Sequence, residues 1–146
     1  MSTKIIYTSA TGNTKEAVEE LETALQDLDQ DVEVFDAEDG VEVDDFFDGA
    51  DNYVVASWSD GANGEVPGGI VDFYDDLDGY DLSGKKVAVL GSGDSSYPHF
   101  CAAVDIFEKL LTDDGAELAA PSVKIELAPD DDAIERIKAL AKALAE

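Results

Sequence analysis

The chain has 146 residues, 45% of them hydrophobic, which is enough for one globular domain with its own core, so we expect a single domain over residues 1–146. Nine Lys and Arg residues against 35 Asp and Glu residues give a formal net charge of -26, which excludes nucleic acids and anionic membranes as partners. The sequence predicts neither a signal peptide nor a membrane span, and the lone Cys101 cannot form an internal disulfide, as expected in a reducing cytoplasm.

The first half of the chain alternates between strand and helix patterns. A short apolar run at 4–7 predicts a strand, and the apolar spacing over 13–28 predicts an amphipathic helix. A second strand is predicted at 32–35. The continuous apolar centre of 51–57 is typical of a strand that is buried on both faces.

The second half continues the alternation. Residues 68–77 and 102–115 have helical patterns, and Gly115 is a suitable residue to end the second of these helices. A buried strand is predicted at 85–93 and a fifth strand at 117–127. A last helix over 130–144 begins with three acidic residues, which are favourable at a helix N-terminus.

This alternation predicts an α/β fold with a parallel sheet covered by helices on both faces. Ligands of such folds bind beyond the carboxyl ends of the strands. Three polar loops are expected at that edge. They are TSATGNT at 8–14, SWSDGANGEVPGG at 57–69 and GSGDSSYPHFC at 91–101.

The first loop has the features of a phosphate site. It leads into a helix, whose N-terminal N–H groups attract phosphate. Four hydroxyl side chains add donors: Thr8, Ser9, Thr11 and Thr14. No Lys follows Gly12, as a triphosphate-binding P-loop would require, so a single phosphate monoester is favoured. The alternative is an ordinary helix start capped by Asn13 or Thr11.

Two aromatic residues lie in the other loops. Trp58 follows a buried strand, and Tyr97 lies between Ser96 and Pro98. Two aromatics at the rim of one crevice can enclose a flat ring, although they can also pack only on neighbouring loops. Asp60 and Asp94 lie in the same loops, but in so acidic a chain either one can be simply solvated.

Together the three loops give the chain a resemblance to the short-chain, FMN-binding flavodoxins. TSATGNT resembles the phosphate loop of that family, ASWSDG its first flavin loop and GSGDSSYPHFC its second. The resemblance covers nearly the whole chain. It implies a flavodoxin-like, doubly wound three-layer sandwich, with a five-stranded parallel sheet in the order 2-1-3-4-5.

The resemblance also implies which residues bind FMN. Those expected around the phosphate are Ser9, Ala10, Thr11, Gly12, Asn13 and Thr14. Those expected in the first flavin loop are Ser57, Trp58, Ser59, Asp60 and Gly61. Those expected in the second are Ser92, Gly93, Asp94, Tyr97, His99, Phe100 and Cys101. Within this set, Trp58 and Tyr97 would flank the ring, and Cys101 is expected to be a buried structural thiol rather than a reactive one.

The implied function is that of a low-potential one-electron carrier, with no catalytic residues and no metal, that acts as a cytoplasmic monomer between oxidoreductases. Its partners would dock through basic surfaces, although the acidity can also serve solubility alone. Two alternatives stay open at this point. One is an FMN-dependent oxidoreductase resembling quinone reductases, and the other is a dedicated flavodoxin-like activator of one enzyme.

Overall fold

The computed structural model describes residues 2–8, 12–58, 69–93, 101–126 and 129–145. The strands are β1 (Ser2–Thr8), β2 (Asp31–Asp36), β3 (Asn52–Trp58), β4 (Lys86–Gly93), β5 (Glu117–Leu118) and β6 (Val123–Glu126). The helices are α1 (Asn13–Asp27), the 3-10 turn η1 (Ala37–Asp39), α2 (Val43–Phe46), α3 (Val71–Leu77), α4 (Ala102–Asp113) and α5 (Asp131–Leu144).

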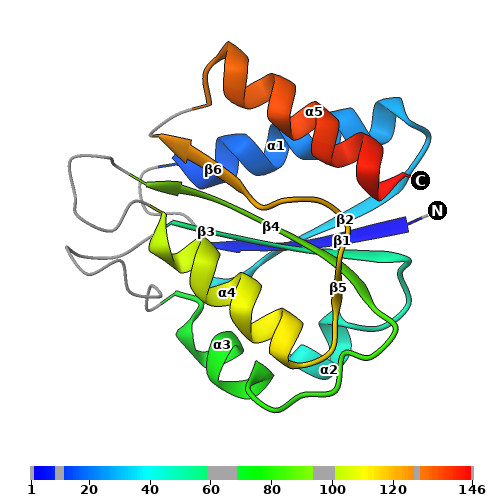
Figure 1. Cartoon of the computed structure of the whole chain (residues 1–146), viewed down its shortest axis with the longest axis vertical. Helices are drawn as coiled ribbons and strands as arrows, with labels where there is room; N and C mark the ends of the chain where they lie inside the picture. The colour runs from blue at the N-terminus through cyan, green and yellow to red at the C-terminus, as the bar shows by residue number, and fades with distance from the viewer. Residues whose placement is uncertain (1, 9–11, 59–68, 94–100, 127–128, 146) are drawn as a thin grey trace.

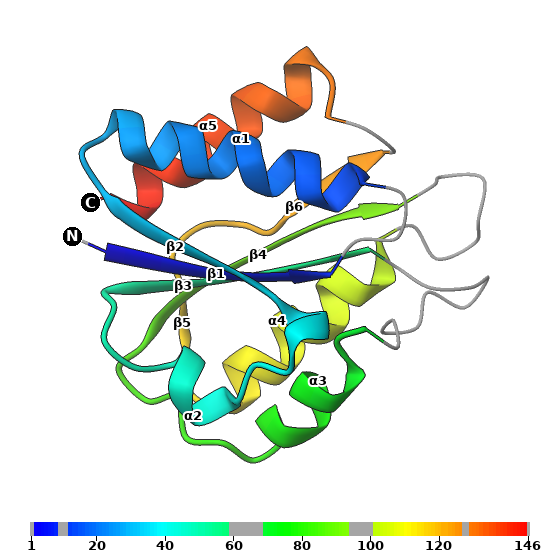
Figure 2. The ribbon, with the colours of Figure 1, turned by 180° about the vertical axis from the view of Figure 1, so that it is seen from behind.

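The strands form one sheet in the order β2-β1-β3-β4-β5, with β6 also paired to β4. Every pairing is parallel. Helices α1 and α5 cover one face, and α2, α3 and α4 cover the other (Figure 1 and, from behind, Figure 2). The predicted three-layer α/β architecture and its strand order are therefore confirmed.

The fifth strand differs from the prediction of one continuous strand over 117–127. Glu117 and Leu118 pair with the start of β4, and pairing resumes only at Val123, opposite Leu90. Between them lies Pro121, which has no backbone N–H to donate to a neighbouring strand. The fifth position of the sheet is therefore filled by two short segments, β5 and β6.

Alternation along the central strands divides the core between the two faces. Ile5, Val54 and Leu90 pack with α1 and α5, whereas Ile6, Val55 and Val89 pack with the helices of the opposite face. All six side chains are almost fully buried. Because successive side chains of a strand point to opposite faces, a continuous apolar run serves both layers.

The short helix α2 and the turn η1 have no counterpart in the sequence prediction. Phe46 of α2 makes edge-to-face contacts with Phe47 and Phe73, at ring-centroid distances of 4.8 and 5.6 Å. A four-residue helix is too short to establish a helical period in the sequence. Tertiary contacts of its aromatic side chains hold this segment in place.

Helix ends are specified locally. Gly115 follows α4 with φ of 99°, a left-handed conformation that glycine adopts without steric cost, as the sequence predicted. Asp130 precedes α5, and its carboxylate accepts a hydrogen bond of 2.8 Å from the backbone N–H of Ala133. In the described part of the chain, no helix combines the length and hydropathy needed to span a bilayer.

Candidate functional site

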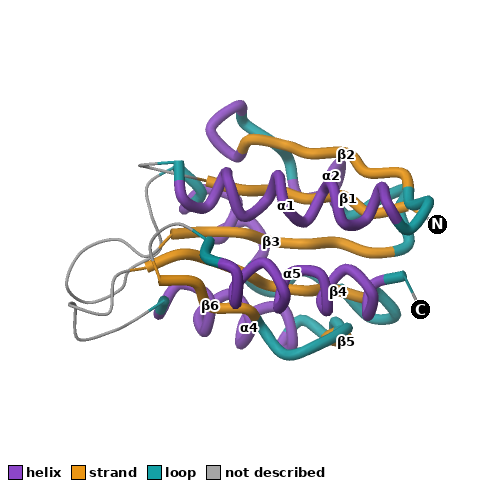
Figure 3. The backbone as a smooth tube through the Cα atoms, turned by 90° about the horizontal axis from the view of Figure 1, so that it is seen from above, coloured by secondary structure: helices purple, strands orange, loops and turns teal. Residues whose placement is uncertain are grey.

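The carboxyl ends of the central strands lie side by side at one edge of the sheet (Figure 3). Thr8 of β1 is paired with Ser57 of β3, which is paired with Gly91 of β4. One residue farther along, Trp58 is paired with Ser92. The three loops that the sequence singled out therefore leave the sheet at neighbouring positions, as a shared ligand site requires.

The first loop ends in a glycine with a left-handed backbone. Gly12 occupies the position before α1 with φ of 93°, and Asn13 is already the first helical residue. The interpretation of Asn13 as the helix cap is therefore wrong. A glycine at this position has no side chain to place between the helix N-terminus and a ligand, which suits a phosphate that approaches the backbone closely.

Thr14, in the first turn of α1, is fully buried and lies next to the end of β4. Its hydroxyl oxygen is 2.6 Å from the hydroxyl oxygen of Ser92, and either group can be the donor. This contact joins residues from two of the three predicted loops. It is the most direct link between the predicted phosphate site and the predicted flavin site in the described part of the chain.

Ser57 and Trp58 end strand β3. The Ser57 side chain is buried and donates a hydrogen bond of 2.8 Å to the backbone carbonyl of Trp58. Trp58 itself is only partly buried, although the six residues before it are fully buried. A large aromatic side chain that stays partly exposed at the predicted ligand edge of a sheet is available to contact a ligand.

Cys101 lies immediately before α4 and closes the third loop. Its backbone has a positive φ of 52°, which is unusual for a residue other than glycine. A Cβ on Gly93 would lie 3.0 Å from the Cys101 sulfur, so the two residues are in close contact. Burial raises the pKa of the Cys101 thiol to about 11, which agrees with the prediction of a structural thiol.

The predicted site residues fall into two groups. Those that lie outside the described residues are Ser9, Ala10, Thr11, Ser59, Asp60, Gly61, Asp94, Tyr97, His99 and Phe100. Those that the structure describes are Gly12, Asn13, Thr14, Ser57, Trp58, Ser92, Gly93 and Cys101, and all of them lie at the carboxyl edge or at the helix starts beside it.

Two glycines at this edge were missing from the predicted site. A Cβ on Gly69 would lie 2.6 Å from the Thr8 hydroxyl oxygen. A Cβ on Gly91 would lie 2.1 Å from the backbone carbonyl oxygen of Ser57 and 2.5 Å from a methyl group of Val104. The sequence carries two glycines at each of these places, in PGG at 67–69 and in GSG at 91–93. Only the contacts in the structure show why glycine is needed at positions 69 and 91.

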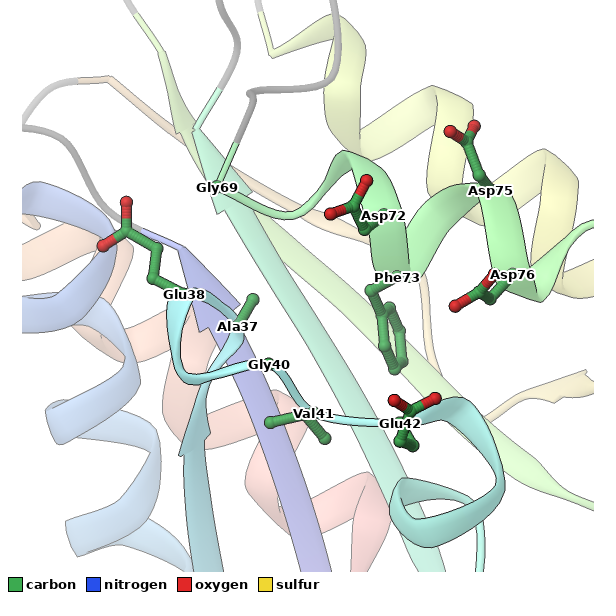
Figure 4. Close-up of a pocket in the computed structure, with 10 residues that line it drawn as sticks. All are labelled: Ala37, Glu38, Gly40, Val41, Glu42, Gly69, Asp72, Phe73, Asp75 and Asp76. Carbon is green, nitrogen blue, oxygen red and sulfur yellow. The ribbon is translucent and has the colours of Figure 1, made fainter.

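An acidic groove of about 640 Å³ lies beside the site, between η1 and α3 (Figure 4). It reaches Gly69 and thus the end of β1. Five carboxylates surround it, from Glu38, Glu42, Asp72, Asp75 and Asp76. Among the described residues, no group of three or more His, Cys, Asp or Glu side chains has the arrangement to hold a metal ion.

Comparison with known proteins identifies the family. The model of the Flavodoxin family matches residues 5–139. A flavodoxin of Maridesulfovibrio salexigens is 39% identical and is matched over 89% of both chains. The protein named probable flavodoxin 2 of Bacillus subtilis is 34% identical over 91% of this chain and 87% of its own length.

A solved structure agrees with these sequence matches. Oxidised Flavodoxin 2 from Bacillus cereus superposes with a TM-score of 0.92, at 40% identity, over 99% of this chain and 98% of that one. These relatives are named as flavodoxins, so neither alternative, the flavin-dependent reductase nor the dedicated activator, is favoured. The chain belongs to the flavodoxin family, whose members bind FMN and carry electrons.

Proposed function

We propose that the carboxyl edge of this sheet binds FMN in one orientation, with its phosphate at the start of α1 and its ring between the loops that follow β3 and β4. The single observation that carries this proposal is the convergence of Gly12, Thr14, Trp58 and Ser92 at one edge. These residues come from three separate segments of the chain. They supply the features that FMN requires, namely a helix N-terminus with a hydroxyl donor for a phosphate and a partly exposed aromatic for a flat ring.

The phosphate end is supported by the geometry of the first turn of α1. Backbone N–H groups at a helix N-terminus carry partial positive charge and favour an anion. Gly12 leaves the approach free of a side chain, and the Thr14 hydroxyl is held in the first turn. Ser9, Ala10, Thr11 and Asn13 complete the proposed phosphate loop.

The ring end is supported by Trp58. It is half-buried next to Ser92 at the edge of the sheet, where it can stack on one face of an isoalloxazine ring. Tyr97 is proposed for the other face. We assign the remaining contacts to Ser57, Ser59, Asp60, Gly61, Gly93, Asp94, His99, Phe100 and Cys101.

Bound FMN supplies reversible electron uptake, and the protein sets how readily that uptake occurs. The net charge of -26 and the acidic groove next to Gly69 support a negative field at the proposed cofactor site. A carboxylate about 8 Å from an added negative charge costs about 2 kcal/mol at an effective dielectric near 20. A field of this sign destabilises added electrons, so we propose a low reduction potential.

The same field favours partners with basic docking surfaces, because opposite potentials accelerate encounter. We further propose that the protein acts as a single-domain monomer in the cytoplasm. The buried, unpaired Cys101 supports a reducing compartment.

The proposal is tested on the purified protein after removal of any bound flavin. Titration with FMN, followed by visible absorption and fluorescence, should restore a yellow one-to-one complex. A parallel titration with riboflavin, which lacks the phosphate, should give weaker binding if the start of α1 holds that group. Equal affinity for both flavins would refute the proposed phosphate site, and no binding of FMN would refute the proposed edge altogether.

A further inference from the structure

The hydroxyl pair of Thr14 and Ser92 is short and shielded from water. The two oxygens are 2.6 Å apart, and the residues are 0% and 4% exposed. Thr14 lies near the start of α1 and Ser92 near the end of β4. Since bulk water cannot reach either group freely, the protein itself decides which hydroxyl donates and which accepts.

Each hydroxyl has one hydrogen and two lone pairs. If Thr14 donates to Ser92, its only hydrogen points away from the helix N-terminus. A phosphate there, which is an acceptor at neutral pH, would then face a lone pair of the Thr14 oxygen. If Ser92 donates to Thr14, the Thr14 hydrogen is free to point at a phosphate oxygen. Only the second arrangement satisfies all three groups.

We infer that Ser92 is a positioning residue for phosphate recognition, which acts through Thr14 and not by touching FMN itself. This inference rests on the proposed phosphate site at the start of α1. Ser92 donates its hydrogen to the Thr14 oxygen, and this bond directs the Thr14 hydrogen toward the phosphate. Hydrogen bonds in such a chain polarise one another, so Thr14 also becomes a stronger donor.

The surroundings of Ser92 favour this role. The strand register places Ser92 between Trp58 and Ile125, and it has a glycine on each side in sequence. These neighbours hold the Ser92 backbone in the sheet, so the position of its hydroxyl is set by β4 rather than by a loop. A donor fixed on a strand can orient Thr14 before the cofactor arrives, which reduces the ordering that binding requires.

The test is a comparison of dissociation constants for FMN and riboflavin across four proteins. The proteins are the wild type, Thr14→Val, Ser92→Ala and the double variant, each prepared without flavin. Thr14→Val should weaken FMN binding by about tenfold or more, because it removes a hydrogen bond to a charged group. Ser92→Ala should weaken FMN binding by about three- to tenfold and riboflavin binding by less than about twofold.

The double variant isolates the coupling between the two residues. In the Thr14→Val background, Ser92→Ala should no longer change the ratio of the two dissociation constants. Ser92→Cys provides a second variant, because its thiol is a weak donor and should give an intermediate ratio. Thr14→Val and Ser92→Ala should each change the ratio of the FMN to the riboflavin dissociation constant. General destabilisation of the fold does not change this ratio, because it weakens the binding of both flavins alike.

Thr3→Val is the matched control. Thr3 is also a buried threonine in a hydroxyl network, where it donates to Gln30 at 3.0 Å, but it lies at the opposite edge of the sheet. Loss of the Thr3 hydroxyl should lower the free energy of unfolding without changing the ratio of the FMN to the riboflavin dissociation constant. If Ser92→Ala behaves like Thr3→Val while Thr14→Val raises the ratio of the FMN to the riboflavin dissociation constant, the inference is wrong and the phosphate site stands. If the wild type itself does not prefer FMN, the proposed site fails first.

Discussion

The backbone carbonyl oxygen of Ser57 occupies the space that a side chain on Gly91 would need. A Cβ there would lie 2.1 Å from that oxygen, and the two residues are paired across β3 and β4 at the ligand edge. We predict that Gly91→Ala forces these strands apart and costs about 1 to 3 kcal/mol of unfolding free energy. Because Trp58 and Ser92 follow directly, FMN affinity should fall as well. Urea unfolding and flavin titration measure the two effects.

Gly79→Ala is the control for this variant. Gly79 has φ of 79° but open space around a Cβ, and it lies beyond the end of α3. An alanine there should cost about 1 kcal/mol through backbone strain alone and leave FMN affinity unchanged. If Gly91→Ala also leaves FMN affinity unchanged, the close approach of the strands does not shape the site.

Cys101 should be unreactive toward thiol reagents in the native protein. Its side chain is buried, and its pKa lies at about 11 rather than 9.0, so the thiolate fraction at pH 8 is about a hundredfold smaller than for an ordinary thiol. Mixing with a disulfide reagent at pH 8 should give a slow colour change that becomes fast in urea. A fast reaction of the folded protein would show that the thiol is accessible.

The raised pKa also predicts a loss of stability in alkali. The folded state keeps the neutral thiol and the unfolded state ionises first, so this contribution is fully present below pH 9 and is lost as the pH rises toward 11. The free energy of unfolding should therefore decline over that interval. The Cys101→Ala variant should lack this part of the decline, although it will be less stable throughout because a buried side chain is shortened.

Much of the fold could be predicted because its signals are local. The apolar centres of β3 and β4 and the helical spacing of α1 and α5 depend on neighbours within about one or two turns. The preference of Gly115 for a positive φ is likewise a property of one residue. The location of the ligand site at the carboxyl ends of the strands could be predicted from the alternation of strands and helices alone, since parallel strands end at the same side of the sheet.

The rest depends on contacts between distant residues. Nothing in the local sequence shows that Thr14 and Ser92, 78 positions apart, share a hydrogen bond. The need for glycine at position 91 arises from the carbonyl of Ser57 on another strand. The interruption of the fifth strand at Pro121 had a local signal, but the apolar residues on both sides masked it.

The acidic groove offers a test of partner docking. Replacing Asp72, Asp75 and Asp76 on α3 by asparagine changes the net charge from -26 to -23 and leaves the fold intact, because all three side chains are exposed. If a basic partner docks here, the reduced, FMN-bound variant should reduce that partner more slowly than the wild type does at low salt. The dependence of this rate on salt concentration should also become weaker. Stopped-flow reduction of a small basic cytochrome measures both.

A second variant with the same net charge separates local docking from overall attraction. Asparagine at positions 27 and 31 and glutamine at position 33 also remove three exposed carboxylates, but they lie at the amino end of β2 and the adjoining end of α1. Docking at the groove predicts that this variant keeps nearly wild-type rates. Equal slowing of both variants would mean that only the total charge matters.

Trp58 is the only tryptophan of the chain, so it reports directly on the proposed ring site. Stacking on a flavin should quench most of its fluorescence during titration with FMN or riboflavin alike. Trp58→Ala should weaken the binding of both flavins by about five- to thirtyfold, corresponding to about 1 to 2 kcal/mol of lost stacking and burial. Unlike the Ser92 variants, it should leave the FMN to riboflavin ratio unchanged, because the ring is common to both ligands.

Tyr80→Ala serves as the control for the loss of an aromatic side chain. Tyr80 is partly buried and packs on Phe47 at a ring-centroid distance of 6.3 Å, in the segment between α3 and β4. Its removal should lower stability without altering the affinity for either flavin. If Trp58→Ala gives the same result, and flavin binding leaves tryptophan fluorescence unchanged, Trp58 does not contact the ring, and its partly exposed position at the end of β3 requires another explanation.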